Sequence, residues 1–181
     1  GKYLDSKDYF TKALKIIEKE ENKDKLAQVY LTVGKIYGEM GDNEKLLQYS
    51  EKVYDLKKSD SDEYMMDSLF NIIESYIDSN NFEQAKKYSK LALAAAIKTK
   101  SKYDEFRALK YYCDIYKYKG ETEISIEYLL KCIDIVSALD KEEVLGNLYI
   151  ELGQLYSGIS KDKELECYQK GVTIFKNLEI I

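Results

Sequence analysis

The side chains best suited to bind another molecule are amides, amines and carboxylates that recur at helical intervals along the chain. Asn71, Asn147 and Gln154 each carry both a hydrogen-bond donor and an acceptor. Such amides can pair with the backbone groups of an extended peptide whatever its sequence. Arg107 can hold a carboxylate through two parallel hydrogen bonds, whereas lysines act as point charges. These residue types predict non-covalent recognition of a mixed-charge peptide or protein.

Patterns for catalysis and for metal binding are missing from the sequence. Its 181 residues include no histidine, no glycine-rich phosphate loop and no G-x-S-x-G nucleophile motif. Cys113, Cys132 and Cys167 form an odd set without C-x-x-C spacing, which argues against a disulfide framework and a zinc site. Carboxylate pairs at helical spacing are common in any charged helical protein and carry no weight without a pocket. We therefore expect no enzyme, no catalytic residue, no cofactor and no metal ion.

Composition and charge limit which classes of binding partner and which cellular compartment are expected. The net charge is −5, and lysine and glutamate are interleaved without a basic stripe, so direct nucleic-acid binding is not expected. No run of about 18 apolar residues is present, and the first ten residues lack the pattern of a secretory signal. Unpaired cysteines fit a reducing compartment. We predict a cytoplasmic protein without membrane contact, and the abundance of Lys, Asn, Ile and Tyr suggests a low-GC bacterium.

Tyrosines recur at a nearly constant interval of about 40 residues, a period in the range of helical repeat proteins. The first tyrosine series consists of Tyr37, Tyr76, Tyr116 and Tyr156. The second tyrosine series follows the first at a constant offset and consists of Tyr49, Tyr88, Tyr128 and Tyr168, with Tyr9 one period earlier. Apolar residues four and seven positions before each member of the first series mark one face of a helix. Since the chain has no proline, these segments are free to be helical.

Each period is expected to form a hairpin of two helices. First helices are predicted at about 25–40, 62–79, 103–119 and 142–158, and a second helix follows each turn. The turns lie four positions after the first tyrosine series, at Gly41, Asn80, Gly120 and Ser160. Glycine and asparagine tolerate the left-handed conformation that ends a helix. Asp42 and Asp162 suit the start of the following helix. Small residues such as Gly34, Cys113 and Gly153 are placed where the helices approach closely, and both tyrosine series are expected to serve packing.

The predicted architecture is all-α, with about four and a half hairpins in one domain spanning 1–181. The predicted parts are a half repeat at 1–24 and repeats at about 25–61, 62–101, 102–141 and 142–181. The half repeat would be a lone second helix over about 5–20, with Tyr9, Ala13 and Leu14 in the register of Tyr88, Ala92 and Leu93. Because such a half repeat cannot bury its apolar face alone, we expect the chain to be the C-terminal part of a longer protein.

The segment Tyr30-Leu31-Thr32-Val33-Gly34, with Tyr37 and Gly41-Asp42, resembles the tetratricopeptide repeat. A second match consists of Tyr76, Asn81-Phe82, Ala85, Tyr88 and Ala92. The resemblance covers nearly the whole chain and implies a right-handed superhelix, or α-solenoid. The family's usual repeat is about 34 residues long and commonly has a proline after the second helix. The longer period here and the absence of proline imply longer second helices or linkers.

The long repeat step also looks like that of bacterial peptide-sensing regulators of the Rap, NprR and PlcR type. This resemblance implies an N-terminal DNA-binding or effector domain in the full-length protein, followed by a repeat domain that binds a short signalling peptide. No segment of this chain reads as a recognition helix. The resemblance therefore predicts the ligand-sensing or regulatory domain of a bacterial transcription regulator.

If the hairpins stack as in the resembled fold, the first helix of each repeat lines the concave face. The outward positions of these helices follow from the tyrosine register, and Asp78 and Lys117 share them. The residues predicted to bind a peptide are Gln28, Thr32, Lys35, Asp67, Asn71, Glu74, Arg107, Lys110, Tyr111, Asp114, Asn147, Glu151 and Gln154.

Other functions stay open at this point. A protein–protein scaffold would use a long exposed face, and self-association as a homodimer would use apolar surface at the two ends of the repeat array. A chaperone-type adaptor would need a carboxylate clamp, which Lys35, Asn71 and Arg107 reproduce in part. Leu31 and Tyr111 break that clamp pattern.

Overall fold

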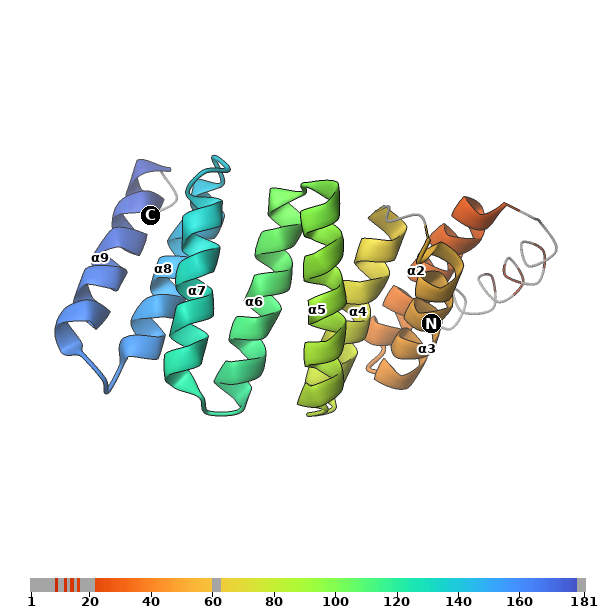
Figure 1. Ribbon diagram of the computed structural model, residues 1–181, viewed down its shortest axis with the longest axis horizontal. Helices are drawn as coiled ribbons and strands as arrows, with labels where there is room; N and C mark the ends of the chain where they lie inside the picture. Colours follow the sequence, from red (N-terminus) through yellow and green to blue (C-terminus); the bar gives the residue numbers. More distant parts are fainter. Residues whose placement is uncertain are drawn as a thin grey trace. The chain divides into compact units, whose positions relative to one another are not determined.

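The structure is a computed structural model that describes residues 22–59 and 63–178, together with Tyr9, Lys12, Leu14 and Ile16. The described ranges contain α-helices and no strand, which confirms the predicted all-α class (Figure 1). The helices are α2 (Lys23–Glu39), α3 (Asn43–Lys57), α4 (Glu63–Asp78), α5 (Phe82–Thr99), α6 (Lys102–Tyr118), α7 (Thr122–Val136), α8 (Glu142–Tyr156) and α9 (Lys161–Asn177).

The chain divides into two compact units, residues 1–95 and 96–181, with α5 crossing the boundary. In the first unit, α3 packs against both α2 and α4, and α2 also contacts α4. In the second unit, α7 packs against both α6 and α8, and α8 packs against α9. Within each unit a second helix therefore packs between its own first helix and the next one, as the repeat pattern predicts. The prediction of one domain over 1–181 stays a prediction.

Polar caps set where several of the helices begin. The Asn22 side chain accepts hydrogen bonds from the backbone N–H groups of Asp24 and Lys25, both at 3.1 Å, and α2 consequently starts at Lys23, two positions before the predicted start. Asp42 caps α3 as predicted, accepting from the Lys45 N–H at 3.2 Å. These bonds satisfy backbone donors that have no partner inside the helix.

Three of the four predicted turns have the expected left-handed residue. The backbone φ angle is 79° at Gly41, 57° at Asn80 and 75° at Gly120. The prediction for the fourth turn was wrong: Gly158 adopts φ 78°, while Ser160 is extended at φ −151° and precedes the first residue of α9. Asp162 accordingly lies inside the first turn of α9. Gly41, Gly120 and Gly158 adopt this conformation without strain because glycine has no Cβ to clash.

The two tyrosine series stack on each other across the hairpins. Ring centroids are 5.8 Å apart for Tyr37 and Tyr49, and the planes are inclined by 7°. The distances are 5.7 Å for Tyr76 with Tyr88 and 5.6 Å for Tyr116 with Tyr128. Because the offset between the two series spans the turn, each tyrosine of the second series lies on the second helix of the hairpin, opposite its partner on the first. The expectation that these tyrosines serve packing is confirmed for these three pairs.

The predicted helix over 5–20 lies largely outside the described residues, Ala13 included. Its described members Tyr9, Lys12, Leu14 and Ile16 are helical. Leu14 is buried in a cluster with Ala27 and Tyr30 of α2. Tyr9 is 73% exposed, so the prediction that it continues the packed second tyrosine series was wrong.

Gly153 lets α8 and α9 approach closely. A Cβ atom at this position would lie 2.7 Å from Cε1 of Tyr168, which is closer than real Cβ contacts allow. We expect Gly153→Ala to lower the free energy of unfolding by up to about 2 kcal/mol, because an overpacking cost of about 1–3 kcal/mol is only partly offset by the helix-propensity gain of about 1 kcal/mol. Urea denaturation measures the change.

Gly38→Ala in α2 is the matched control for that experiment. Its Cβ would meet Cδ2 of Leu46 at 3.0 Å, and this atom is the end of a flexible side chain that can move aside. We expect little loss of stability for this variant. A Gly153→Ala protein as stable as the parent would show that α8 and α9 can separate without cost.

Candidate functional site

Four of the predicted binding residues line one cavity in the first unit. The cavity has a volume of about 290 Å³ and lies between α2 and α4. Its predicted members are Gln28, Thr32, Lys35 and Asp67, and its other members are Leu31, Glu63 and Tyr64. We call it the α2–α4 cavity. The structure thus brings together predicted residues from the first helices of two successive repeats.

The walls of the α2–α4 cavity differ in chemistry. On α2, Gln28 and Lys35 are exposed and offer N–H donors, while the Thr32 hydroxyl donates to the Gln28 carbonyl at 2.8 Å. On α4, Glu63 and Asp67 are one helical turn apart and offer carboxylates. Leu31, buried at 7% exposure, and the half-buried ring of Tyr64 supply apolar surface. The cavity therefore has donors on the α2 wall, carboxylates on the α4 wall and apolar surface from both helices.

Asn71 lies one turn beyond Asp67 on α4 and holds a buried donor. Its Nδ2 atom is enclosed and has no hydrogen-bond partner among the described residues. A buried donor left unsatisfied costs about 1–3 kcal/mol of folding free energy. An acceptor that bonded to this nitrogen would remove that penalty. Glu74, the remaining predicted residue of this helix, is exposed.

The second unit joins three other predicted residues in an ionic cluster. Lys110 Nζ lies 2.5 Å from Oδ1 of Asp114 on the same helix and 3.2 Å from the Glu151 carboxylate of α8. Lys117 Nζ lies 3.3 Å from the same carboxylate. We call Lys110, Asp114, Lys117 and Glu151 the Lys110 cluster. Its two positive and two negative charges cancel.

Burial makes the charges of the Lys110 cluster depend on one another. Burial by itself disfavours the ammonium of Lys110, but Asp114 and Glu151 outweigh this effect and raise its pKa above the ordinary value. Burial raises the pKa of Asp114, and Lys110 offsets part of that rise. The lysine is therefore the counter-ion that favours the ionised form of Asp114 inside the protein.

The Lys110 cluster is not suited to hold a metal ion, although Cys113, Asp114 and Glu151 place three potential ligand atoms within 4.8 Å of one another. Burial raises the pKa of the Cys113 thiol to about 11, so the thiolate that a metal requires is disfavoured at neutral pH. Its Sγ atom also lies 3.3 Å from Oγ of Ser125. The ammonium groups of Lys110 and Lys117 together already balance the two carboxylates.

The remaining predicted residues lie on α6 and α8. Arg107 and Tyr111 are half-buried on α6, and Nη1 of Arg107 lies 3.7 Å from Asp104. Asn147 and Gln154 are exposed on α8.

Sequence reasoning missed Leu31, Glu63 and Tyr64 because it selected polar residues inside the predicted register. Glu63 could have been found, since it lies one turn before Asp67 on the same helical face.

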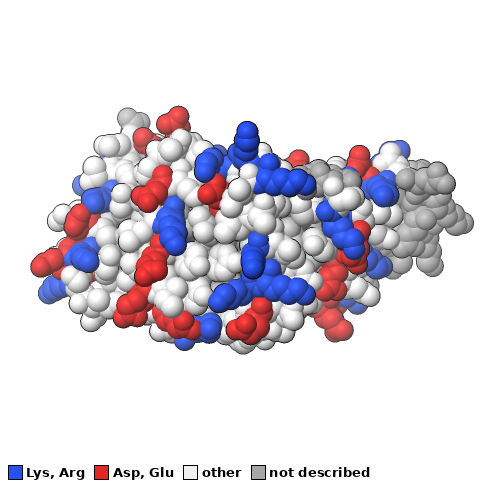
Figure 2. Space-filling model, viewed as in Figure 1, with Lys and Arg blue, Asp and Glu red and all other residues white. Residues whose placement is uncertain are grey.

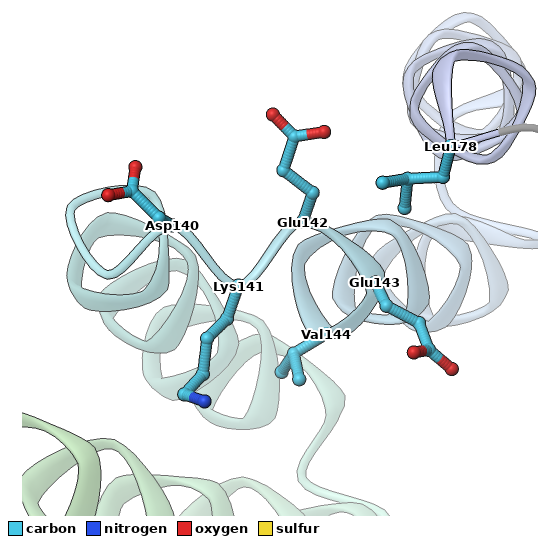
Figure 3. Close-up of a pocket in the computed structure, with 6 residues that line it drawn as sticks. All are labelled: Asp140, Lys141, Glu142, Glu143, Val144 and Leu178. Atoms are coloured by element: carbon cyan, nitrogen blue, oxygen red, sulfur yellow. The ribbon is translucent and has the colours of Figure 1, made fainter.

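A larger cavity of about 510 Å³ in the second unit contains none of the predicted residues. It lies at the turn between α7 and α8 and is lined by Asp140, Lys141, Glu142, Glu143, Val144 and Leu178. Figure 3 shows the charged side chains pointing in different directions from the turn and from the start of α8. A ligand site needs polar groups that converge on one place, so this cavity is a weaker candidate.

The surface carries mixed charge. Lys and Arg side chains are interspersed with Asp and Glu over the face seen in Figure 2.

Within the described ranges, no helix combines the length and the apolar character needed to cross a bilayer.

Known proteins with similar helical hairpins were found by comparison of both sequence and structure. The family model described as tetratricopeptide repeat matches residues 27–60 and 114–135. The crystal structure of BtubC from P. vanneervenii superposes with a TM-score of 0.88 at 15% identity, covering 99% of this chain and 75% of that one. The fold is of the tetratricopeptide type. The comparison with curated proteins found no match.

Two Rap proteins share the tetratricopeptide-type fold. The apo form of RapI superposes with a TM-score of 0.87 at 13% identity, covering 98% of this chain and 65% of that one. A Rap protein complexed with competence and sporulation factor gives a TM-score of 0.81 at 17% identity, covering 98% of this chain and 50% of that one. The predicted resemblance to tetratricopeptide and Rap-type repeats is confirmed at the level of the fold.

Proposed function

We propose that this chain is a binding module for a short peptide or an extended protein segment, and that the α2–α4 face of the first unit is its recognition surface. The observation that carries the proposal is the enclosed Asn71 amide nitrogen without a partner, one turn from the α2–α4 cavity. A backbone carbonyl of an extended ligand is an acceptor for this donor once the Asn71 side chain turns out of its enclosed position, and such a carbonyl is present at every residue of the ligand. The exposed Gln28 amide offers a second contact of the same kind.

The charged side chains of the Lys110 cluster are already paired with one another, which makes the first unit the better place for charged contacts with a ligand. Lys110 already lies against two carboxylates, so a charged ligand group would have to displace an internal partner there. Lys35 and Glu63, by contrast, form no ion pair with the described residues. Breaking a buried ion pair is costly, whereas pairing an exposed charge is not.

We propose further that the module senses a ligand for a bacterial transcription regulator. The similarity in fold to RapI and to the Rap protein complexed with competence and sporulation factor supports this proposal. The chain spans 65% and 50% of those two proteins. In this proposal an effector domain elsewhere in the full-length protein responds when the repeats bind their cytoplasmic ligand.

Asn71→Ala is expected to weaken ligand binding by about 1–3 kcal/mol, because it removes a charge-neutral hydrogen bond from an enclosed site. The measurement is isothermal titration against peptides purified by size from the source organism's medium. Asn177→Ala, at the exposed end of α9, is the matched control and should leave the affinity unchanged. Unchanged affinity in Asn71→Ala would exclude the α4 face. Recovery of a folded protein partner, and of no peptide, would favour the scaffold function instead.

A further inference from the structure

The two walls of the α2–α4 cavity are complementary to a ligand in which a positively charged group lies next to a hydrogen-bond acceptor. The α4 wall carries the carboxylates of Glu63 and Asp67, and the α2 wall carries the ammonium of Lys35; Glu63 forms no ion pair with the described residues. An anionic group would be repelled by these carboxylates, and a neutral donor would gain less from them than a cation does. The Glu63 carboxylate therefore favours a ligand group with a positive end.

Lys35 decides which cationic group fits. The head of a lysine or arginine side chain carries only donors and positive charge, so it would face the Lys35 ammonium as a like charge. The first residue of a peptide differs, because its α-ammonium is followed closely along the backbone by a carbonyl oxygen. That oxygen can accept a hydrogen bond from Lys35 or Gln28 while the α-ammonium faces Glu63 and Asp67.

The size and base of the cavity agree with a single residue. Sites that enclose a drug-sized ligand have volumes of roughly 300–1,000 Å³, and the α2–α4 cavity, at about 290 Å³, lies just below that range. Leu31 and Tyr64 offer apolar surface for one side chain. An apolar first residue thus finds a surface for its side chain as well as partners for its backbone.

We propose that the α2–α4 cavity captures the amino-terminal residue of a peptide, with the free α-ammonium on Glu63 and Asp67 and the first carbonyl oxygen on the α2 wall. This inference rests on the proposed function, because it assigns one end of the peptide that the α2–α4 face would bind. It also gives the peptide a starting point one helical turn from the Asn71 donor.

The test uses the full chain and leucyl-leucinamide as the probe, followed by NMR chemical-shift titration. We expect saturable shifts of the amides of the cavity residues. Acetylation of the probe's amino group should weaken binding by about tenfold or more, as for loss of one charge-assisted hydrogen bond. N-acetyl-lysinamide, which carries its cation on the side chain, should also bind more weakly than the free dipeptide amide by about tenfold. Equal binding of the acetylated probe, stronger binding of N-acetyl-lysinamide, or no shift at the cavity would each overturn the proposal.

Variants separate this inference from the proposed function. The double change Glu63→Gln and Asp67→Asn should weaken the free dipeptide amide by about tenfold. Glu83→Gln, an exposed carboxylate on α5, should leave its binding unchanged. If a peptide recovered from the medium loses affinity in Asn71→Ala but not in the double variant, the binding module stands and the amino-terminal site is wrong. If neither change affects any peptide, both fail.

Discussion

Replacing Lys110 by methionine is expected to lower the free energy of unfolding by about 3 kcal/mol at neutral pH, since removing one partner of a buried ion pair leaves an uncompensated charge. The side chains of Asp114 and Glu151 are only 25% and 16% exposed, so water cannot replace the missing ammonium fully. Lys117 would still pair with Glu151, which leaves Asp114 as the principal site of the loss. Urea denaturation of the variant and the parent measures the difference.

The loss in Lys110→Met should depend on pH in a defined direction. The pKa of Asp114 is already raised by burial in the folded parent, and removing Lys110 raises it further. A carboxyl group whose folded pKa exceeds its unfolded value of about 3.9 destabilises the fold once it ionises, so the loss grows as pH rises through the folded pKa and disappears below the unfolded one. The stability difference between parent and variant should therefore be small near pH 4 or below and large at pH 7.

Lys170→Met is the matched control for the pH series. Lys170 pairs with Glu166 at 2.7 Å, but the two side chains are 50% and 61% exposed. Water screens such a pair, and its removal should change the stability little at either pH. A loss in Lys110→Met that is equal at acidic and neutral pH would show that the lysine's alkyl chain, and not its charge, stabilises the second unit.

The hairpins could be predicted from the sequence because the tyrosine spacing fixes both the period and the turn. The first helices start within two positions of their predicted starts, at Lys23, Glu63, Lys102 and Glu142. The fourth turn was misplaced because α8 ends at Tyr156 itself, whereas α2 and α6 continue past their tyrosines to Glu39 and Tyr118. Gly158 then supplies the left-handed residue two positions before the predicted one.

The predicted binding face could be assigned only in part, because a helical register gives the direction of a side chain and not its partner. The pair of Lys110 and Asp114 follows from their i, i+4 spacing on one helix. Glu151 joins them from another helix, 41 residues from Lys110, and its place depends on how α6 and α8 approach. For the same reason no sequence pattern shows that the Asn71 nitrogen is enclosed and without a partner among the described residues.

Tyr128→Ala is expected to cost about 3–5 kcal/mol of unfolding free energy, which is the usual range for removing a large packed aromatic side chain. Its ring lies between two others, with centroids 5.0 Å from Tyr112 and 5.6 Å from Tyr116, and both pairs have interplanar angles of 11°. Lys131 Nζ lies 4.7 Å from its centroid and adds a cation–π contact. Removing this one ring therefore removes two ring contacts between α6 and α7 and one cation–π contact within α7. Urea denaturation of the purified variant measures the loss.

Two further variants separate the ring of Tyr128 from its hydroxyl and from general surface effects. Tyr128→Phe keeps the stacked ring, so its loss should be small beside that of the alanine variant. Tyr118→Ala removes a tyrosine that is 66% exposed and outside both tyrosine series, and its effect should stay within about 0.5 kcal/mol. If Tyr128→Ala costs no more than Tyr118→Ala, packing does not account for the tyrosine period.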